Sequence, residues 1–200
     1  MQQTKKQPKN DSTATNDVGK MKEEIRAQYG ENKTITDDNY DKSLAVKCIN
    51  GTFVGTKTED VIVYKGIPFV GQQPVGELRW KAPVDYVPND GVYEAYYKAK
   101  SPRQNESFSE GASLYYQSED CLYLNIWKAD EAAMKKPVMV WIHGGAFEFG
   151  GTADPLYECR NFAEENPEVI VVGITYRPAI RRSVQPNPPT ARRRSGRCMT

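Results

Sequence analysis

The segment that most constrains this chain is an apolar run that ends in a glycine-rich loop, Pro137–Gly151. Five apolar residues in succession, Val138 to Ile142, show no polar alternation, which is typical of a strand covered on both faces in a parallel sheet. Most of them are β-branched, which favours strand over helix. Gly144 and Gly145 then leave successive backbone N–H groups unshielded and able to point at one site. The sequence therefore predicts a buried strand leading into a loop that can hold an oxyanion.

Three motifs in a fixed order connect the chain to a known family. HGGAF at His143–Phe147 is close to the HGGG-type loop of lipases and esterases, SEDCLYLN occupies Ser118–Asn125, and YKGIPFVGQQPVGELRW occupies Tyr64–Trp80. Together they resemble the type-B carboxylesterases, the α/β-hydrolase family that includes the cholinesterases. The resemblance covers about residues 45–177. It implies an α/β fold, the N-terminal part of an α/β-hydrolase, in which a small antiparallel meander leads into a mixed, mainly parallel sheet.

The resemblance also implies roles for individual residues. By motif position, the N–H groups of Gly145 and Ala146 are the oxyanion donors of the loop His143–Phe147. The family's third donor, the residue after the nucleophile, has no counterpart in the sequence. The motifs further imply a partly buried ion pair between Arg79 and Glu119, which joins a Pro-rich loop to the strand that follows Cys121.

The 200 residues lack several of the catalytic residues that a serine esterase requires. A serine esterase requires a Ser in a G-x-S-x-G turn, a His that accepts its proton and an acid that orients the His. G-x-S-x-G does not occur, and the only His, His143, adjoins the oxyanion loop and is interpreted as structural. A nucleophilic Cys159 or Cys198 paired with His143 has no motif behind it. No catalytic Ser, acid or His is therefore assigned.

The resemblance implies carboxylic ester hydrolysis through a serine acyl-enzyme, without metal or organic cofactor, on a small-molecule ester. We interpret the chain as a truncated, inactive portion of such an enzyme. One alternative is a non-catalytic binding or adhesion homologue of the esterase fold. Another is nucleic-acid binding through an Arg-rich tail, although no nucleic acid or membrane is expected as a partner.

The cysteines and the hydropathy indicate in which cellular compartment the protein is expected. Four Cys residues are widely spaced, with no C-x-x-C, so no zinc site is expected. In many secreted relatives the Cys that corresponds to Cys121 forms a disulfide, but Arg103 stands in the partner's place. The sequence has neither an apolar run of membrane-spanning length nor a signal-peptide core. We therefore expect a cytoplasmic protein.

Composition divides the chain into three parts. Residues 1–43 are a polar leader that we expect to be partly disordered, with one amphipathic helix at Asp17–Tyr29 and weak packing up to about Tyr40. Residues 44–177 are the esterase-like domain. Residues 178–200 hold six of the 11 Arg residues and none of the 26 acidic residues, and we interpret them as an unrelated, disordered basic tail, translated in a shifted frame or left by truncation.

Local patterns predict the order of elements. Asn50-Gly51 predicts a hairpin within an antiparallel meander over residues 44–64. Residues 67–83 predict an irregular loop held in place by Phe69, Leu78 and Trp80.

The second half of the domain predicts a crossover. A strand at Cys121–Trp127 is expected to be the neighbour of the strand at Pro137–Ile142. A helix at Tyr157–Asn166 and an apolar strand at Val169–Tyr176 then predict a crossover into a parallel sheet. This last strand is expected to be an unprotected edge, which predicts aggregation or chaperone binding.

Overall fold

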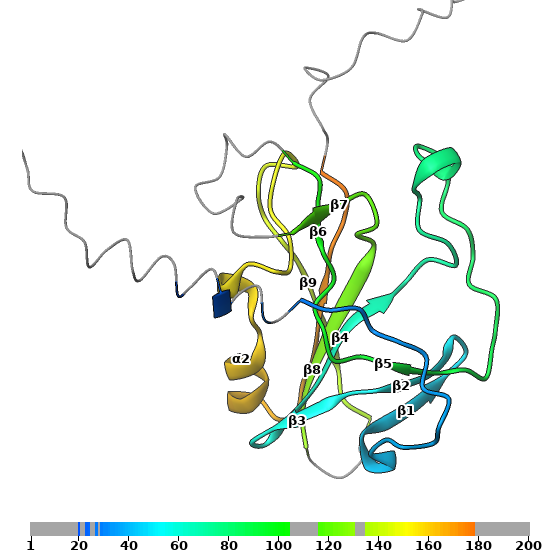
Figure 1. Cartoon of the computed structure of the whole chain (residues 1–200). Coiled ribbons are helices and arrows are strands. Elements are labelled where there is room, and N and C mark those ends of the chain that lie inside the picture. Colours follow the sequence, from blue (N-terminus) through cyan, green and yellow to red (C-terminus); the bar gives the residue numbers. More distant parts are fainter. Residues whose placement is uncertain are drawn as a thin grey trace, which may run out of the picture.

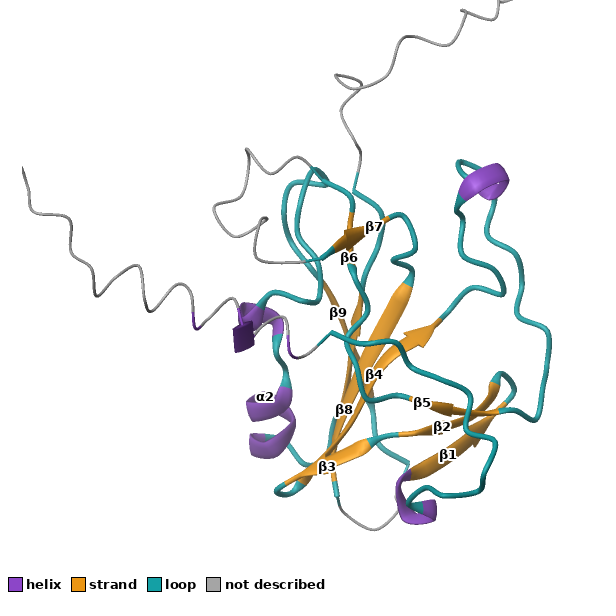
Figure 2. Cartoon of the chain, in the orientation of Figure 1, coloured by secondary structure: helices purple, strands orange, loops and turns teal. Residues whose placement is uncertain are grey.

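The computed structural model describes residue 20, residues 23–24, residue 27, and residues 29–104, 116–130 and 135–178. Residues 179–200 of the expected basic tail and most of the expected N-terminal helix lie outside these residues. Within them the chain forms a five-stranded, a three-stranded and a two-stranded sheet. Figure 1 shows how the sheets lie in space, and Figure 2 shows that strands and loops predominate over helices.

The five-stranded sheet has the order β3-β4-β8-β10-β9. These strands span, in chain order, Thr56–Thr58 (β3), Val61–Pro68 (β4), Tyr123–Ala129 (β8), Val138–Ile142 (β9) and Ile170–Ile174 (β10). Pairing is antiparallel from β3 to β10 and parallel between β10 and β9. The predicted crossover into a parallel pair is confirmed. The expectation that β8 and β9 are neighbours is wrong, because β10 inserts between them.

The three-stranded sheet consists of β1 (Ala45–Cys48), β2 (Gly51–Val54) and β5 (Val92–Glu94). The predicted Asn50-Gly51 hairpin is confirmed, since β1 pairs antiparallel with β2 and the turn residue Gly51 has φ +122°. The predicted single meander is wrong, because β2 and β3 belong to different sheets. Gly55 separates them, and an added Cβ there would collide with the Val63 carbonyl and the Tyr64 ring.

Shorter elements complete the described chain. The 3-10 turns and the two-stranded parallel sheet span Lys42–Leu44 (η1), Gly76–Leu78 (η2), Pro155–Tyr157 (η5), Ser101–Pro102 (β6) and Gln117–Ser118 (β7). Helix α2 spans Arg160–Glu165 and lies within the helix predicted from the sequence. Asp154 caps the turn that precedes it, because its side chain accepts a hydrogen bond from Leu156 N at 2.9 Å.

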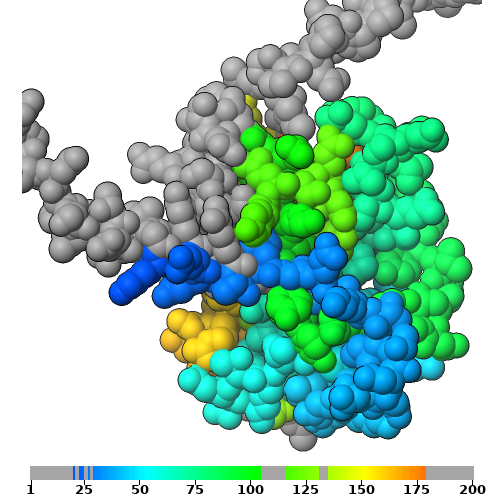
Figure 3. All heavy atoms as spheres, viewed as in Figure 1, coloured from blue at the N-terminus to red at the C-terminus, as the bar shows by residue number. Residues whose placement is uncertain are grey.

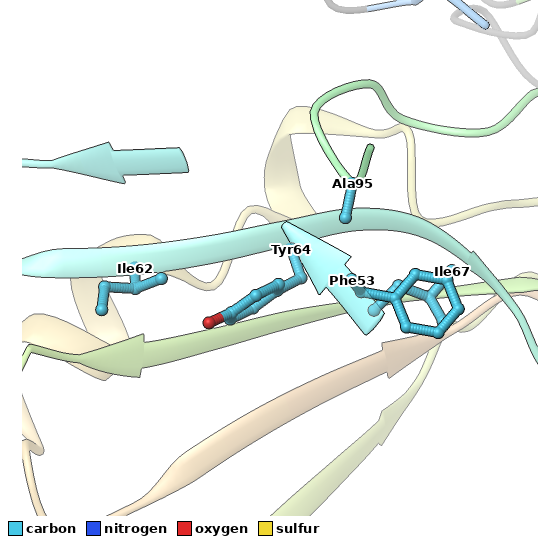
Figure 4. Close-up of a cluster of buried hydrophobic side chains, with 5 residues drawn as sticks. All are labelled: Phe53, Ile62, Tyr64, Ile67 and Ala95. Carbon is cyan, nitrogen blue, oxygen red and sulfur yellow. The ribbon is translucent and has the colours of Figure 1, made fainter. Parts of the chain in front are cut away.

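Strand β4 is covered on both of its faces. Alternate residues of a strand point to opposite sides, and here each side enters a different core. One core lies between β4 and the three-stranded sheet, and its buried members, drawn in Figure 4, are Phe53, Ile62, Tyr64, Ile67 and Ala95. The other lies beneath α2, and its buried members are Val61, Val63, Trp127, Ala163 and Val171.

A largely buried polar network joins Glu158, between η5 and α2, to the sheet. Lys98, only 3% exposed at its side chain, places Nζ 2.6 Å from Glu158 Oε2, and Trp127 donates from Nε1 to Glu158 Oε1 at 2.6 Å. Burial disfavours ionisation of Glu158, but the charge of Lys98 and the two hydrogen bonds outweigh it and hold the pKa of Glu158 below its ordinary value. Sequence reasoning missed this network, because no motif marks it.

Strand β9 is exposed, contrary to the prediction of a strand covered on both faces. Val138, Val140 and Ile142 are 57%, 54% and 61% exposed, and Trp141 on the opposite face is 42% exposed. In the described chain β9 is the edge of the sheet, with β10 as its one neighbour. The predicted bare edge at β10 is therefore wrong, and β9 takes that position.

The segment 29–36 is packed, although weak packing was expected there. It runs beside residues 92–98 and is joined to them by Ile35 N to Val92 O at 2.8 Å and Glu94 N to Lys33 O at 2.9 Å. The Asn32 amide also donates to the carbonyls of Lys65 and Tyr97. Figure 3 shows this segment in blue, lying across the surface beside green atoms from around residue 100. We call it the N-terminal strap.

Candidate active site

The loop His143–Phe147 begins where β9 ends, at the exposed edge of the sheet. Gly145 has φ +120°, and Ala146 and Phe147 follow at +53° and +60°. Positive φ is common for Gly and unusual for the two larger residues, so this loop is locally strained. An added Cβ on Gly145 would collide with the carbonyl of Phe149, so only Gly fits there.

The loop is closed by its own backbone and leaves two amides available. Glu148 N and Phe149 N both donate to Gly145 O, at 2.9 and 3.1 Å. Among the described residues, neither Gly145 N nor Ala146 N donates a hydrogen bond. Ala146 is exposed and Phe147 is 73% exposed, so ligands can reach the loop from solvent. Two free N–H groups on adjacent residues are able to bind a negatively charged oxygen.

The buried side chain of His143 packs against this loop from the interior of the protein. It is 2% exposed, and its Nδ1 lies 2.9 Å from Gly144 O. Its ring stacks on Tyr176, with centroids 4.2 Å apart, and Tyr176 donates from its hydroxyl to His143 O at 3.2 Å. Burial lowers the pKa of His143 despite the contact with Gly144 O, so the neutral ring is favoured. These contacts fix the His143 ring against the loop and Tyr176.

The Gln104 side chain holds the chain at Gly150, just beyond the loop His143–Phe147. The Gln104 side chain accepts from Gly150 N at 2.7 Å and donates to Gly150 O at 3.0 Å. Gly150 has φ +103°, and a Cβ there would press on Gly144 O and on the His143 ring. The hydroxyls of Thr152 and Thr175 lie 2.6 Å apart, which ties the chain after Gly150 to the residue that follows β10. Sequence reasoning missed Gln104, because it lies far from the loop in the chain and carries no motif.

Arg79 and Glu119 lie together, as the motifs imply. Arg79 Nη2 lies 2.8 Å from Glu119 Oε1, and both side chains are about one-third exposed (31% and 30%). Trp80 was expected to help hold its loop in place, but its side chain is 66% exposed. Its ring instead faces the guanidinium groups of Arg79 and Arg177, whose Cζ atoms lie 5.3 and 6.0 Å from its centroid.

Cys121 is a buried free thiol. Burial raises its pKa to about 12, so the thiolate is strongly disfavoured at neutral pH. Arg103, which stands where the resemblance puts a Cys partner, lines the same cavity of about 30 Å³ as Cys121. Cys159 is a free, partly buried thiol whose pKa is also raised by burial. Neither thiol has the electropositive, accessible setting of a reactive Cys.

The part of the chain that the structure describes lacks both a metal-binding cluster and a membrane-spanning helix. The described residues contain no group of three or more His, Cys, Asp or Glu residues placed to hold a metal ion. They also contain no helix with the length and apolar character needed to cross a bilayer.

Comparisons with known proteins identify the fold. The structure is similar to that of a thermophilic PNB esterase, with a TM-score of 0.63 and 38% sequence identity over 69% of this chain and 29% of that one. The carboxylesterase EST55 of Geobacillus stearothermophilus matches with a TM-score of 0.58 and 41% identity, over 68% of this chain and 26% of that one. The described residues therefore form part of an α/β-hydrolase fold.

Sequence comparison gives the family. Residues 41–180 match the profile of the family described as the Carboxylesterase family. The para-nitrobenzyl esterase of Bacillus subtilis is 41% identical over 129 residues, which are 64% of this chain and 26% of that protein. The fumonisin B1 esterase of Sphingopyxis macrogoltabida is 38% identical over 122 residues, 60% of this chain and 22% of that protein. The chain belongs to the carboxylesterase family, and it spans about a quarter of the length of these relatives.

Proposed function

We propose that the loop His143–Phe147 supplies oxyanion-stabilising donors for carboxylic ester hydrolysis through a serine acyl-enzyme. The observation that carries this proposal is the pair of unengaged amides on Gly145 and Ala146, held in a strained turn by buried His143 and by Gln104. Family membership supports the reaction class. Small-molecule esters are the proposed substrates, since relatives are named as esterases.

In the proposed reaction, a Ser hydroxyl oxygen adds to the ester carbonyl carbon as a base removes its proton. The carbonyl electron pair moves to oxygen, and Gly145 N–H and Ala146 N–H donate to the resulting oxyanion. The oxyanion collapses, the C–O bond to the alcohol breaks, and the alcohol leaves with a proton. Water then repeats the addition and releases the acid. Removing a single donor of this kind costs about 10²–10³ in kcat.

We further propose that the 200 residues alone do not turn over esters. They contain no G-x-S-x-G, and their one His is committed to supporting the loop. The loop also lies beside a bare strand in the described chain, and donors exposed to water lose most of their electrostatic advantage. The purified chain should therefore hydrolyse p-nitrophenyl butyrate no faster than a heat-denatured sample. Saturable turnover that a His143→Ala variant loses would contradict this proposal and favour a Cys-His pair.

A chimera tests the role of the loop directly. Residues 41–177 would replace the matching segment of the B. subtilis para-nitrobenzyl esterase, and the chimera should hydrolyse p-nitrophenyl butyrate. Gly145→Ala in the chimera should lower kcat by about 10²–10³ and change KM less, because the added Cβ displaces the donors.

Gly76→Ala is the matched control for this substitution. Gly76 also has positive φ, +56°, but nothing lies within 4 Å of an added Cβ. Gly76→Ala therefore introduces the strain of a positive φ at Ala, but not the steric collision that Gly145→Ala introduces. Equal losses of kcat in both variants would show that the loop His143–Phe147 has no specific role in the reaction.

A further inference from the structure

A cavity of about 390 Å³ lies apart from the oxyanion loop. Its walls come from the N-terminal strap, from β2, β4 and β5, and from the chain around residues 97–100 and 120–123. It shares no residue with the loop His143–Phe147. Its volume falls within the range of about 300–1,000 Å³ that is usual for small-molecule sites.

The lining combines aromatic rings with an excess of carboxylates. The acidic residues are Glu31, Glu94 and Asp120, against a single cation, Lys100. Within the part of the chain that the structure describes, none of these four side chains forms an ion pair. The aromatic residues are Phe53, Tyr86, Tyr93, Tyr97 and Tyr123.

Several of these groups are fixed in place before any ligand binds. Tyr123 donates to Asp120 Oδ1 at 2.6 Å, and Tyr93 donates to Asn89 Oδ1 at 3.0 Å. The Tyr97 ring packs so closely on Gly30 that an added Cβ would lie 2.5 Å from its Cγ. Glu94 accepts from the Lys33 backbone N at 2.9 Å, which orients the carboxylate but leaves its charge uncompensated. A site fixed in this way loses little entropy when it binds.

The charge and the spacing select the class of ligand. An anion would meet a net negative wall, and a purely apolar ligand would desolvate carboxylates without replacing their water. A bare metal ion needs several oxygen ligands converging on one point, and the described carboxylates form no such group. An organic cation, whose charge is spread over an apolar surface, suits both the negative charge and the aromatic lining of the cavity. Aromatic faces and distant carboxylates attract it together.

We propose that this cavity binds a small organic ammonium ion, with Asp120 as its nearest fixed counter-ion and the Tyr rings against its apolar groups. Burial, and then the hydrogen bond to Asp120, raise the pKa of Tyr123, so its hydroxyl stays protonated and keeps Asp120 oriented at neutral pH. The site is independent of the proposed esterase chemistry.

Calorimetric titration of the full chain with tetramethylammonium chloride tests the proposal, with tert-butanol as an uncharged probe of similar size. Tetramethylammonium should bind saturably with one site, and tert-butanol should not. Asp120→Asn retains the shape and the acceptor for Tyr123 but removes the charge. It should weaken binding about three- to tenfold, as expected for loss of one partly exposed charge at an aromatic site.

Glu165→Gln is the matched control, because it removes one exposed carboxylate from α2, which contributes nothing to the cavity. It should leave binding unchanged. If circular dichroism shows that Asp120→Asn is unfolded, Glu31→Gln at the exposed strap replaces it, with the same expected direction. No saturable binding, equal binding of both probes, or equal losses in the cavity variant and the control would each overturn the proposal.

Discussion

Strands β8 and β9 both carry a tryptophan and an apolar sequence, but they have opposite environments. Trp127 on β8 is fully buried between α2 and the sheet, while Trp141 on β9 is 42% exposed. β8 lies between β4 and β10, whereas β9 has one neighbour in the described chain. Apolar composition therefore identifies a strand here, but the order of strands in the sheet decides which one is buried.

The buried and the exposed strands also differ in what they support, the stability of the fold or the candidate site. The two cores, the Lys98–Glu158 pair and α2 all lie around β4, β8 and β10. The loop His143–Phe147 follows the exposed strand β9, and it is held locally by contacts of His143 and Gln104. Substitutions in the first region should therefore change unfolding, while substitutions of the exposed side chains of β9 should change the surface with little effect on unfolding.

The same substitution in the two strands gives the largest expected difference. Trp127→Ala should lower the free energy of unfolding by about 3–5 kcal/mol, because it leaves a large cavity beneath α2. It also removes the hydrogen bond to Glu158. Trp141→Ala should cost about 1 kcal/mol or less, since its ring keeps much of its exposure to water in the folded chain. Denaturant unfolding followed by circular dichroism measures both, and similar midpoint shifts would show that β9 is buried in solution.

The next effect concerns pH and the buried pair. The pKa of Glu158 is below its ordinary value of 4.5 in the folded chain. Its stabilisation is therefore present above pH 4.5 and is lost as the pH falls from there through the folded pKa. Glu158→Gln leaves Lys98 buried without a counter-charge and should cost about 3 kcal/mol at pH 7. Below pH 4.5 the two unfolding curves should converge.

Glu164→Gln serves as the control for this pH series. It lies on α2, is 40% exposed and is 3.8 Å from Arg160. Such an exposed pair contributes about 0–0.5 kcal/mol, so the control should follow the native protein at every pH. A constant offset between native and Glu158→Gln proteins from pH 7 to pH 3 would show that the pair does not titrate in this range.

Sequence reasoning predicted the local features of the fold and missed the long-range ones. The Asn50-Gly51 hairpin and the β9-α2-β10 crossover follow from short-range turn and helix signals. The position of β10 between β8 and β9 does not, because pairing between strands distant in sequence depends on which faces α2 and the small sheet cover.

The candidate site shows the same division. The glycine loop was predictable, since HGGAF is a local pattern with a known backbone consequence. Gln104 and Glu158 were not predictable, because a polar residue reveals its partner only once the chain has folded. The packed strap was also missed, since Asn32 bonds to backbone groups that carry no side-chain signature.

The smallest expected effect on stability tests the bare edge itself. Val140 is 54% exposed on β9, with Val138 and Ile142 beside it on the same face. A row of exposed apolar residues on an edge strand promotes association between chains, and a charge there blocks it. Val140→Lys should therefore shift the purified protein towards monomer in sedimentation velocity, while the free energy of unfolding changes by only about 0.5 kcal/mol. Thr58→Lys adds the same charge to the exposed end of β3, the opposite edge of the sheet, and should leave association unchanged. If both variants reduce association equally, the cause is net charge, and β9 is not the surface through which the chains meet.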